Sequence, residues 1–318
     1  MNARLDSLAP APAVRRFVVS GSLRLAVYQW GDPQLPTLLL VHGYPDNHAV
    51  WLPLIQRLAG RFHLVAYDVR GAGESDKPSR TGDYRLELLS QDLQAVLDAV
   101  SPEQPVHLVA HDWGSIQTWE SVTDPRLRAR IASYTSISGP CLDHVGCWMR
   151  ERLRSRQPRA LLELFTQLLH SWYIYYFHLP LLPELGWRLG GARLWPQFLR
   201  RVEGLRAPAP NPHQASDGRH GVKLYRANFI GAIFSPRQRY TEVPVQLIVP
   251  TRDHFVGAPL FQRLPQWAPR LWRREAQAGH WQLLAEPQQL AGWIDQFVSH
   301  IDGAAASDSL RLARQPAH

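Results

Sequence analysis

The chain has 318 residues, of which 45% are hydrophobic and 19% charged. This balance is typical of a globular protein and excludes general disorder. The formal net charge of +8 is compatible with a nucleic-acid partner, but the excess is confined to residues 141–240, which hold 15 Arg or Lys and 6 Asp or Glu. The rest of the chain holds 20 basic and 21 acidic residues.

The basic segment is also rich in Trp, Leu and Tyr, a mixture that fits an anionic membrane surface or a lipid-like ligand as well as phosphate. Solubilising surface arginines are the alternative. Residues 1–14 contain no apolar core of a signal peptide, and no apolar run approaches the roughly 20 residues of a membrane span. Cys141 and Cys147 are expected to be free thiols. We therefore expect a cytoplasmic monomer or homodimer that binds no nucleic acid, with peripheral membrane contact through the basic segment as an option.

The first part of the chain alternates strand-like and helix-like runs. Residues 16–20 and 23–29 alternate apolar and polar side chains around a Gly-Ser pair and predict an antiparallel hairpin. Short apolar runs then predict strands, and helical spacing predicts the helices between them. The strands are 37–41, 63–67, 106–109 and 131–137, and the helices are 51–58, 86–100 and 115–121. This repetition predicts a mainly parallel sheet with helices on both faces.

The pattern changes after residue 140. Residues 141–240 contain helical runs broken by prolines, which predict a helical cap inserted over the sheet. Alternation then resumes, with strands at 245–249 and 271–275 and helices at 260–267 and 287–298. We therefore predict an α/β core of residues 14–140 and 241–300, a helical cap of residues 141–240, and a flexible, polar tail of residues 303–318.

Asp112 lies at the junction of a predicted strand and a predicted helix, in the sequence His-Asp-Trp-Gly. The small residues Ala110 and Gly114 flank it at two positions on either side. This pattern is similar to the nucleophile elbow of α/β-hydrolases, a strained turn that lifts one side chain above the sheet. Serine is the usual residue there. A carboxylate is instead useful against a saturated carbon with a leaving group, where it forms an alkyl ester. The alternative is an aspartate that caps the helix.

Two more polar residues follow predicted strands at the same edge of the sheet. Asp253 follows the strand at 245–249, and His280 follows the strand at 271–275. The chain order nucleophile, acid, base is the order of the α/β-hydrolase triad. His280 would deprotonate a water, and Asp253 would orient His280 and stabilise its charged form. A turn residue and a histidine without a role are the alternatives, but their joint occurrence at these strand ends favours the triad.

A glycine-bearing loop, His42-Gly43-Tyr44-Pro45-Asp46, follows the strand at 37–41. A loop in this place can turn a backbone N–H toward the elbow. We expect the backbone N–H groups of Tyr44 and Trp113 to form an oxyanion hole for the ester on Asp112.

Five motifs together resemble those of α/β-hydrolase-fold epoxide hydrolases, over residues 17–297. They are His42 to Pro45, Asp68 to Pro78, His111 to Gly114, Asp253 to Val256, and Gly279 to Trp281. The second motif is most similar to hydrolase domains fused to short-chain dehydrogenases, although this chain shows no second fingerprint. The resemblance implies hydrolysis of a hydrophobic epoxide to a vicinal diol through an ester on Asp112, with no metal and no cofactor. Ala110 departs from the glycine usual before the elbow.

The resemblance also implies two cap tyrosines that protonate the opening epoxide oxygen. Tyr173 matches the first and Tyr225 the second, and a slipped alignment would place Tyr175 or Tyr176 at the first position. An aromatic stripe that only packs the cap is the alternative. The residues expected to line the substrate pocket are Trp113, Tyr176 and Trp281.

Three other functions compete. A haloalkane or haloacid dehalogenase shares the aspartate, histidine and acid, but it needs no tyrosine pair and usually has asparagine where this chain has Tyr44. An ester hydrolase is disfavoured by the absence of an elbow serine. A non-catalytic, lipid-binding member of the same fold is the third alternative, and measured turnover would exclude it.

Overall fold

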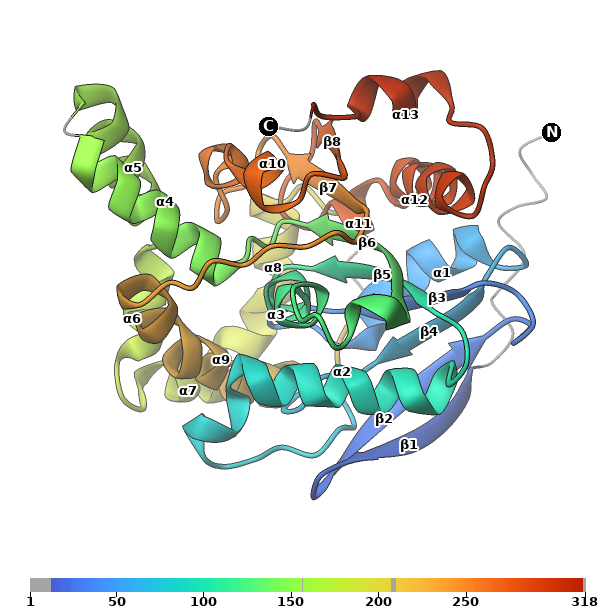
Figure 1. Cartoon of the computed structure of the whole chain (residues 1–318). Helices are drawn as coiled ribbons and strands as arrows, with labels where there is room; N and C mark the ends of the chain where they lie inside the picture. The colour runs from blue at the N-terminus through green and yellow to red at the C-terminus, as the bar shows by residue number, and fades with distance from the viewer. Residues whose placement is uncertain (1–12, 156, 207–209, 317–318) are drawn as a thin grey trace.

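The computed structural model describes residues 13–155, 157–206 and 210–316. Figure 1 shows a central twisted sheet with helices packed on both sides. The sheet has eight strands in the order β1-β2-β4-β3-β5-β6-β7-β8. They are β1 Val14–Ser20, β2 Leu23–Trp30, β3 Thr37–Val41, β4 His63–Tyr67, β5 Val106–His111, β6 Ile131–Ile137, β7 Val245–Pro250 and β8 Leu271–Ala276.

The pairing confirms the predicted fold class. β1 and β2 form the predicted antiparallel hairpin, and β2 pairs antiparallel with β4. All remaining neighbours, from β4 to β8, pair in parallel. The helices of the core are η1 His48–Trp51, α1 Leu52–Leu58, η2 Thr81–Tyr84, α2 Leu86–Val100, α3 Trp113–Val122, η3 Arg128–Arg130, η5 Ala258–Phe261, α10 Leu264–Trp267, α11 Gln282–Ala285 and α12 Pro287–Ile301.

The apolar strands fill two cores, one on each face of the sheet. In β3, Leu39 and Val41 belong to the core that contains α2 and α3, whereas Leu38 and Leu40 belong to the core that contains α1 and α12. Successive side chains of a strand point to opposite faces, so a strand covered on both faces must be apolar throughout. This explains the continuous apolar runs that predicted the central strands.

The site is positioned by a change of direction in the strand order. From β3 the chain first crosses to β4 on one side and then returns to β5 on the other side of β3. In open α/β sheets, ligands bind where the order reverses in this way, beyond the carboxyl ends of the strands. The loops after β3 and β5 therefore meet at this edge.

All regular elements in the described part of residues 141–240 are helical, and they lie between β6 and β7. They are α4 Leu142–Ser155, α5 Pro158–His170, α6 Trp172–His178, α7 Leu182–Gly186, the π-helical turn η4 Trp187–Gly191, α8 Ala192–Val202 and α9 Gln214–Phe234. Figure 1 shows α4 and α5 extending away from the sheet, with α6, α7 and α9 grouped beside them. Cys141 and Cys147 are free cysteines. Among the described helices, none is both long enough and apolar enough to cross a membrane.

Two expectations differ from the structure. The predicted helix at 260–267 is two short helices, η5 and α10, because Pro265 favours the start of a new helix near its position. The prediction of a flexible tail for residues 303–318 is wrong for its described part, which contains the helix α13 Asp308–Ala313. Leu310 is fully buried with Trp272 and Phe297, and these contacts hold the tail against β8. Two leucines in a small, polar segment, of which only Leu310 is buried, were too weak a signal to predict this.

Candidate active site

Asp112 occupies a strained turn between β5 and α3. Its φ and ψ are 51° and −123°, a conformation that residues other than glycine rarely adopt and that clusters at functional sites. Gly114 is needed for this turn, because a Cβ atom there would lie 2.1 Å from the carbonyl oxygen of Val41. The close approach of α3 to the end of β3 therefore depends on the absence of a side chain at position 114.

The Asp112 carboxylate does not cap α3, although Asp112 stands at the N-cap position. Its Oδ1 instead accepts a hydrogen bond of 2.7 Å from the backbone N–H of Tyr44. Gly43 permits this contact, since a Cβ atom at that position would lie 2.4 Å from Asp112 Oδ1. Trp113 is the first residue of α3, so its backbone N–H has no acceptor within the helix. Of the two N–H groups expected to form the oxyanion hole, that of Tyr44 thus contacts the Asp112 carboxyl group, and that of Trp113 belongs to the next residue in the chain.

His280 lies between the two aspartates that the sequence assigned to it. Its Nδ1 is 2.9 Å from Asp253 Oδ2, and its Nε2 is 3.4 Å from Asp112 Oδ2. The other Asp253 oxygen, Oδ1, accepts the N–H groups of Phe255 (2.8 Å) and Val256 (3.0 Å), which fix the plane of the carboxylate. His280 is therefore within reach of both other members of the predicted triad.

Burial and the neighbouring charges shift the pKa values of His280 and Asp253 in opposite directions. Burial by itself lowers the pKa of His280, but the Asp253 carboxylate and the hydrogen bonds to Asp112 and Asp253 raise that pKa well above 6.5. Burial raises the pKa of Asp253, yet the His280 charge and the backbone N–H groups hold it below 3.8. The contacts of His280 with Asp253 and Asp112 therefore favour its charged form.

Three side chains that sequence reasoning missed hold the loop that carries His280. His111 Nε2 donates to the carbonyl oxygen of His280 over 2.9 Å, and burial lowers the pKa of His111 to about 4, so this ring is neutral. Glu203 Oε2 accepts the backbone N–H of Trp281 (3.1 Å), and Asp46 Oδ2 accepts the indole N–H of Trp281 (2.9 Å). His111 stands next to Asp112 in the sequence and was a detectable candidate. Glu203 belongs to the cap, and no local pattern marks it.

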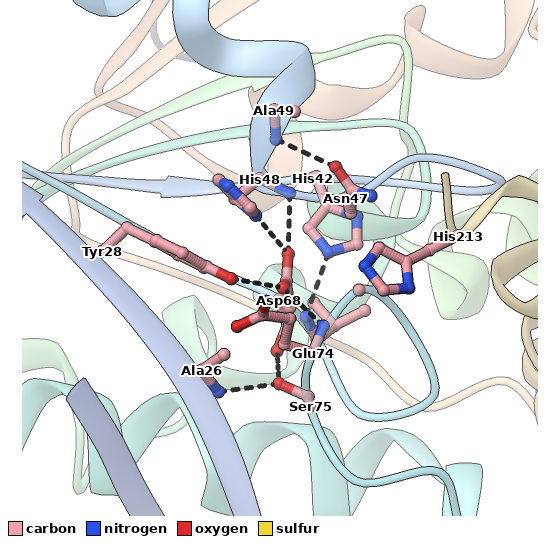
Figure 2. A network of polar contacts seen from close by, with 12 residues as sticks. Ala26, Tyr28, His42, Asn47, His48, Ala49, Asp68, Glu74, Ser75 and His213 are labelled. Carbon is pink, nitrogen blue, oxygen red and sulfur yellow. Dashed lines mark hydrogen bonds and ion pairs between the residues drawn. The ribbon is translucent and has the colours of Figure 1, made fainter. Parts of the chain in front are cut away.

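A buried polar network joins the loops that follow β3 and β4 (Figure 2). At its centre is Asp68, a fully buried carboxylate that accepts hydrogen bonds from Tyr28 Oη (3.2 Å), His48 N (2.9 Å), His48 Nδ1 (2.8 Å) and Glu74 N (2.9 Å). Burial raises the pKa of Asp68, but the hydrogen bond and charge of His48 outweigh it and lower the pKa to about 2. His42 Nε2 accepts the N–H of Val69 in the same region. The network thereby holds the loop that presents the N–H of Tyr44.

Asp112 faces a cavity of about 610 Å³ between the core and the cap. Tyr173 from α6 and Tyr225 from α9 line this cavity together with Tyr176 and Trp281. A smaller cavity of about 110 Å³ also borders Asp112, Tyr173 and Tyr225, and Trp113 lines it. Each predicted pocket residue therefore lies at one of two cavities that share the nucleophile candidate and both tyrosines.

The two matched tyrosines differ from their neighbours. Burial and the nearby Asp112 charge raise the pKa of both Tyr173 and Tyr225, so both hydroxyl groups stay protonated at neutral pH. The Oη of Tyr176 donates to the carbonyl oxygen of Leu182 (3.3 Å), and Tyr175 is 58% exposed. The rings of Tyr173 and Tyr225 are 6.0 Å apart, edge to face. The alternatives Tyr175 and Tyr176 are thus less suited to face Asp112.

Known proteins resemble this chain over most of its length. "Probable oxidoreductase EphD" of Mycobacterium tuberculosis is 37% identical over 301 residues, covering 92% of this chain and 50% of that protein. This chain thus spans about half the length of that relative. Epoxide hydrolase 3 of Xenopus tropicalis is 28% identical over 301 residues, covering 84% of this chain and 72% of that protein.

Solved structures share the fold. An epoxide hydrolase from Bacillus megaterium superposes with a TM-score of 0.75 at 22% identity, covering 89% of this chain and 100% of that chain. Epoxide hydrolase VrEH1 from Vigna radiata gives a TM-score of 0.72 at 20% identity, covering 91% and 98%. The family model of the alpha/beta hydrolase fold matches residues 36–287. The elbow, the sheet order and this match agree, and the chain belongs to the α/β-hydrolase fold family.

Proposed function

We propose that the protein is an epoxide hydrolase that converts a hydrophobic epoxide to a vicinal diol. The observation that carries this proposal is the shared cavity, in which the core provides the Asp112 carboxylate and the cap provides the hydroxyl groups of Tyr173 and Tyr225. A halide leaves as a stable anion, whereas an epoxide oxygen leaves as an alkoxide and needs an acidic O–H. Relatives named epoxide hydrolases support the same assignment.

In the first step, Asp112 Oδ2 attacks one epoxide carbon. The bond from this carbon to the ring oxygen breaks, and the oxygen takes a proton from Tyr173 or Tyr225. Asp112 Oδ1, already hydrogen-bonded to the N–H of Tyr44, becomes the carbonyl oxygen of the new ester. The hydrogen bond that orients the nucleophile is therefore the bond that later stabilises negative charge on the same oxygen.

Between the two steps, charged His280 passes its proton to the tyrosinate. In the second step, His280, now neutral, takes a proton from a water, and the water oxygen attacks the carbonyl carbon of the ester. Esterification has replaced the Asp112 carboxylate with a neutral group, so one of the charges that raised the pKa of His280 is gone. The pKa of His280 consequently falls when a base is required, and Asp253 continues to stabilise the imidazolium that forms. Collapse of the tetrahedral intermediate breaks the bond to the diol oxygen and restores the Asp112 carboxylate. His280 keeps the proton that it took from water, which returns it to its resting charged form.

The test is the intact mass of a His280→Gln variant after incubation with a panel of epoxides and alkyl halides. Attack by Asp112 does not need His280, whereas hydrolysis of the ester does, so the ester accumulates. We expect a mass gain equal to the whole epoxide, which is absent in His280→Gln/Asp112→Asn. His300→Gln, a variant of a histidine outside the site, should turn over the epoxide without an adduct.

The other outcomes distinguish the competing functions. A gain equal to the alkyl group of a halide, with no gain from any epoxide, would make the protein a dehalogenase. No adduct in His280→Gln together with no turnover by the unaltered protein across the panel would favour a lipid-binding protein of this fold.

A further inference from the structure

Large apolar side chains that solvent reaches are concentrated in the cap. Of the 21 such side chains among the described residues, 13 lie between residues 161 and 202. We call these 13 the apolar cap surface: Leu161, Leu162, Phe165, Leu169, Trp172, Tyr175, Leu179, Leu181, Leu182, Leu185, Leu189, Leu194 and Val202. Soluble monomers rarely expose apolar patches of more than a few hundred Å², and larger ones mark interaction sites.

In helix α5, the exposed apolar side chains follow a regular spacing in the sequence. Ala160 and Leu164 are buried on its inner side, whereas Leu161, Phe165 and Leu169 follow one another at four-residue spacing and are exposed. Residues at this spacing share one face of a helix. The exposed side of α5 thus carries a row of apolar side chains, although solvent would favour polar residues there.

The apolar cap surface reaches the large cavity at three of its side chains. Trp172, Leu189 and Leu194 are 65%, 77% and 58% exposed, and the same three side chains line the cavity that holds Asp112. A hydrophobic molecule that leaves an apolar phase at this surface would meet these three apolar side chains at the cavity.

The charged side chains in this part of the cap that form no ion pair with a described residue are mainly basic. The acids of this part of the cap are engaged: Glu163 pairs with Arg152, Glu184 pairs with Arg226, and Glu203 accepts the N–H of Trp281. Five exposed arginines form no ion pair with any residue that the structure describes. They are Arg188, Arg193, Arg200, Arg201 and Arg206. The available charge is therefore positive.

We propose that the apolar cap surface docks on an anionic lipid surface, with the cavity mouth facing the lipid. Apolar side chains would enter the boundary between headgroups and acyl chains, and the five arginines would contact lipid phosphates. A second copy of this chain is a less suitable partner, because a two-fold contact would bring the same arginines of both copies together. Delivery of substrate from the lipid rests on the proposed function, whereas docking itself does not.

The test is co-sedimentation with vesicles of phosphatidylcholine alone or of phosphatidylcholine with about one quarter phosphatidylglycerol, at about 0.1 M salt. The apolar variant is Leu162→Ser/Phe165→Ser/Leu169→Ser on α5, whose side chains line neither cavity. Its matched control is Val14→Ser/Val19→Ser/Leu312→Ser, which replaces three exposed apolar side chains far from the cap in sequence. The charge variant is Arg200→Gln/Arg201→Gln, and its control is Arg57→Gln/Arg128→Gln.

We expect the unaltered protein to bind the anionic vesicles at least about tenfold better than neutral ones. The apolar variant should lose at least about tenfold in partition coefficient, because three inserted side chains are removed. Each arginine near an anionic surface contributes about fivefold, so the charge variant, which lacks two, should lose about twenty-five-fold. Both controls should stay within about twofold, and higher salt should weaken binding of the unaltered protein.

The proposal fails if the unaltered protein does not bind anionic vesicles, or if the variants bind like their controls. A dimer in solution that the apolar variant dissociates would instead assign this surface to a second copy. Hydrolysis of a small, water-soluble epoxide by the apolar variant shows that it is folded. Vesicle binding without any turnover would overturn the proposed function and leave docking standing, whereas turnover without vesicle binding would do the reverse.

Discussion

The α/β core buries its apolar side chains on both faces of the sheet, whereas the cap leaves many of its own exposed. Every residue of β3, β4 and β5 is buried, and no side chain of α5 other than Ala160 and Leu164 is. The core is thus closed and holds its groups rigidly. The cap has an outer surface that suits a second apolar phase.

The two regions contribute different chemistry to the same cavity. In the proposed reaction, the core provides the groups that form and break the ester, Asp112, Asp253 and His280, at the ends of strands. The cap provides the hydroxyl groups of Tyr173 and Tyr225 and the cavity mouth. We expect changes in the core to remove function or folding outright, and changes in the cap to have graded effects.

The largest expected effect is on turnover. Asp112→Asn should lower kcat for an epoxide at least about 10⁴-fold, because no other side chain can form the ester. Asparagine has the same shape and tolerates a positive φ, so the variant should unfold at a temperature close to that of the unaltered protein. Steady-state kinetics and thermal unfolding measure the two properties. Asp98→Asn, an exposed surface change, is the control, and a loss of less than tenfold in Asp112→Asn would refute the nucleophile assignment.

A second prediction compares the stability of the two regions. Leu40 is fully buried in β3, whereas Leu162 on α5 is 63% exposed. Leu40→Ala should lower the free energy of unfolding by about 3 kcal/mol, because it leaves a cavity in the core. Leu162→Ala should change it by less than about 0.5 kcal/mol. Urea unfolding measures both, and a similar loss in both variants would mean that the outer face of α5 is packed in solution.

The core was predictable from sequence because its signals are local. The structure places β3 and α2 at the predicted residues. The apolar run that predicts β3 and the helical spacing that predicts α2 each lie wholly inside one element, so no contact with a distant segment is needed to recognise them. The elbow was also local, because Asp112 and the small residue Gly114 lie two positions apart. The assignment of Tyr173 and Tyr225 was not local. It came from a family resemblance, since no pattern in α6 or α9 shows that they meet over Asp112.

What sequence reasoning missed depends on contacts between distant segments. Glu203 reaches the N–H of Trp281 only because the end of α8 lies beside the loop after β8. Leu310 anchors α13 because Trp272 and Phe297 leave room for one more apolar side chain. Each of these contacts joins two segments that are far apart in the sequence and share no motif. A single sequence therefore does not indicate that the two segments meet.

The third prediction concerns the two tyrosines of the cap. Tyr173→Phe and Tyr225→Phe should each lower kcat about tenfold to a hundredfold, because one donor remains in each variant. The double variant should lose about 10³-fold or more, because the opening oxygen then lacks any acidic O–H. Tyr240→Phe, which changes an exposed ring, should have no effect. If both single variants keep full activity on epoxides, the tyrosines only pack the cap.

The smallest expected effect concerns two buried carboxylates with opposite pKa shifts. Asp68 in the core has its pKa lowered to about 2 by His48, against the effect of burial. Asp217, on α9 of the cap, accepts hydrogen bonds from Gly73 N (2.9 Å), Asn211 Nδ2 (3.1 Å) and Asn47 Nδ2 (3.2 Å), and no cation pairs with it among the described residues. Burial therefore prevails and raises the pKa of Asp217 to about 6. The contact that Asp217 makes between cap and core should change with pH in the range from 4 to 6.

The sign follows from linkage. A carboxyl group whose folded pKa lies above its unfolded value binds more protons in the folded state, so its contribution is complete below pH 4 and is lost as the pH rises through 6. Between pH 7 and pH 5 this contribution should increase the free energy of unfolding by about 1 kcal/mol. Asp217→Asn should lack this increase, while Asp68 stays ionised over the same range and adds no difference. Urea unfolding of both proteins at the two pH values isolates the contribution, because every other titrating group is shared. An equal pH response in the two proteins would show that the three neutral donors keep Asp217 ionised despite its burial.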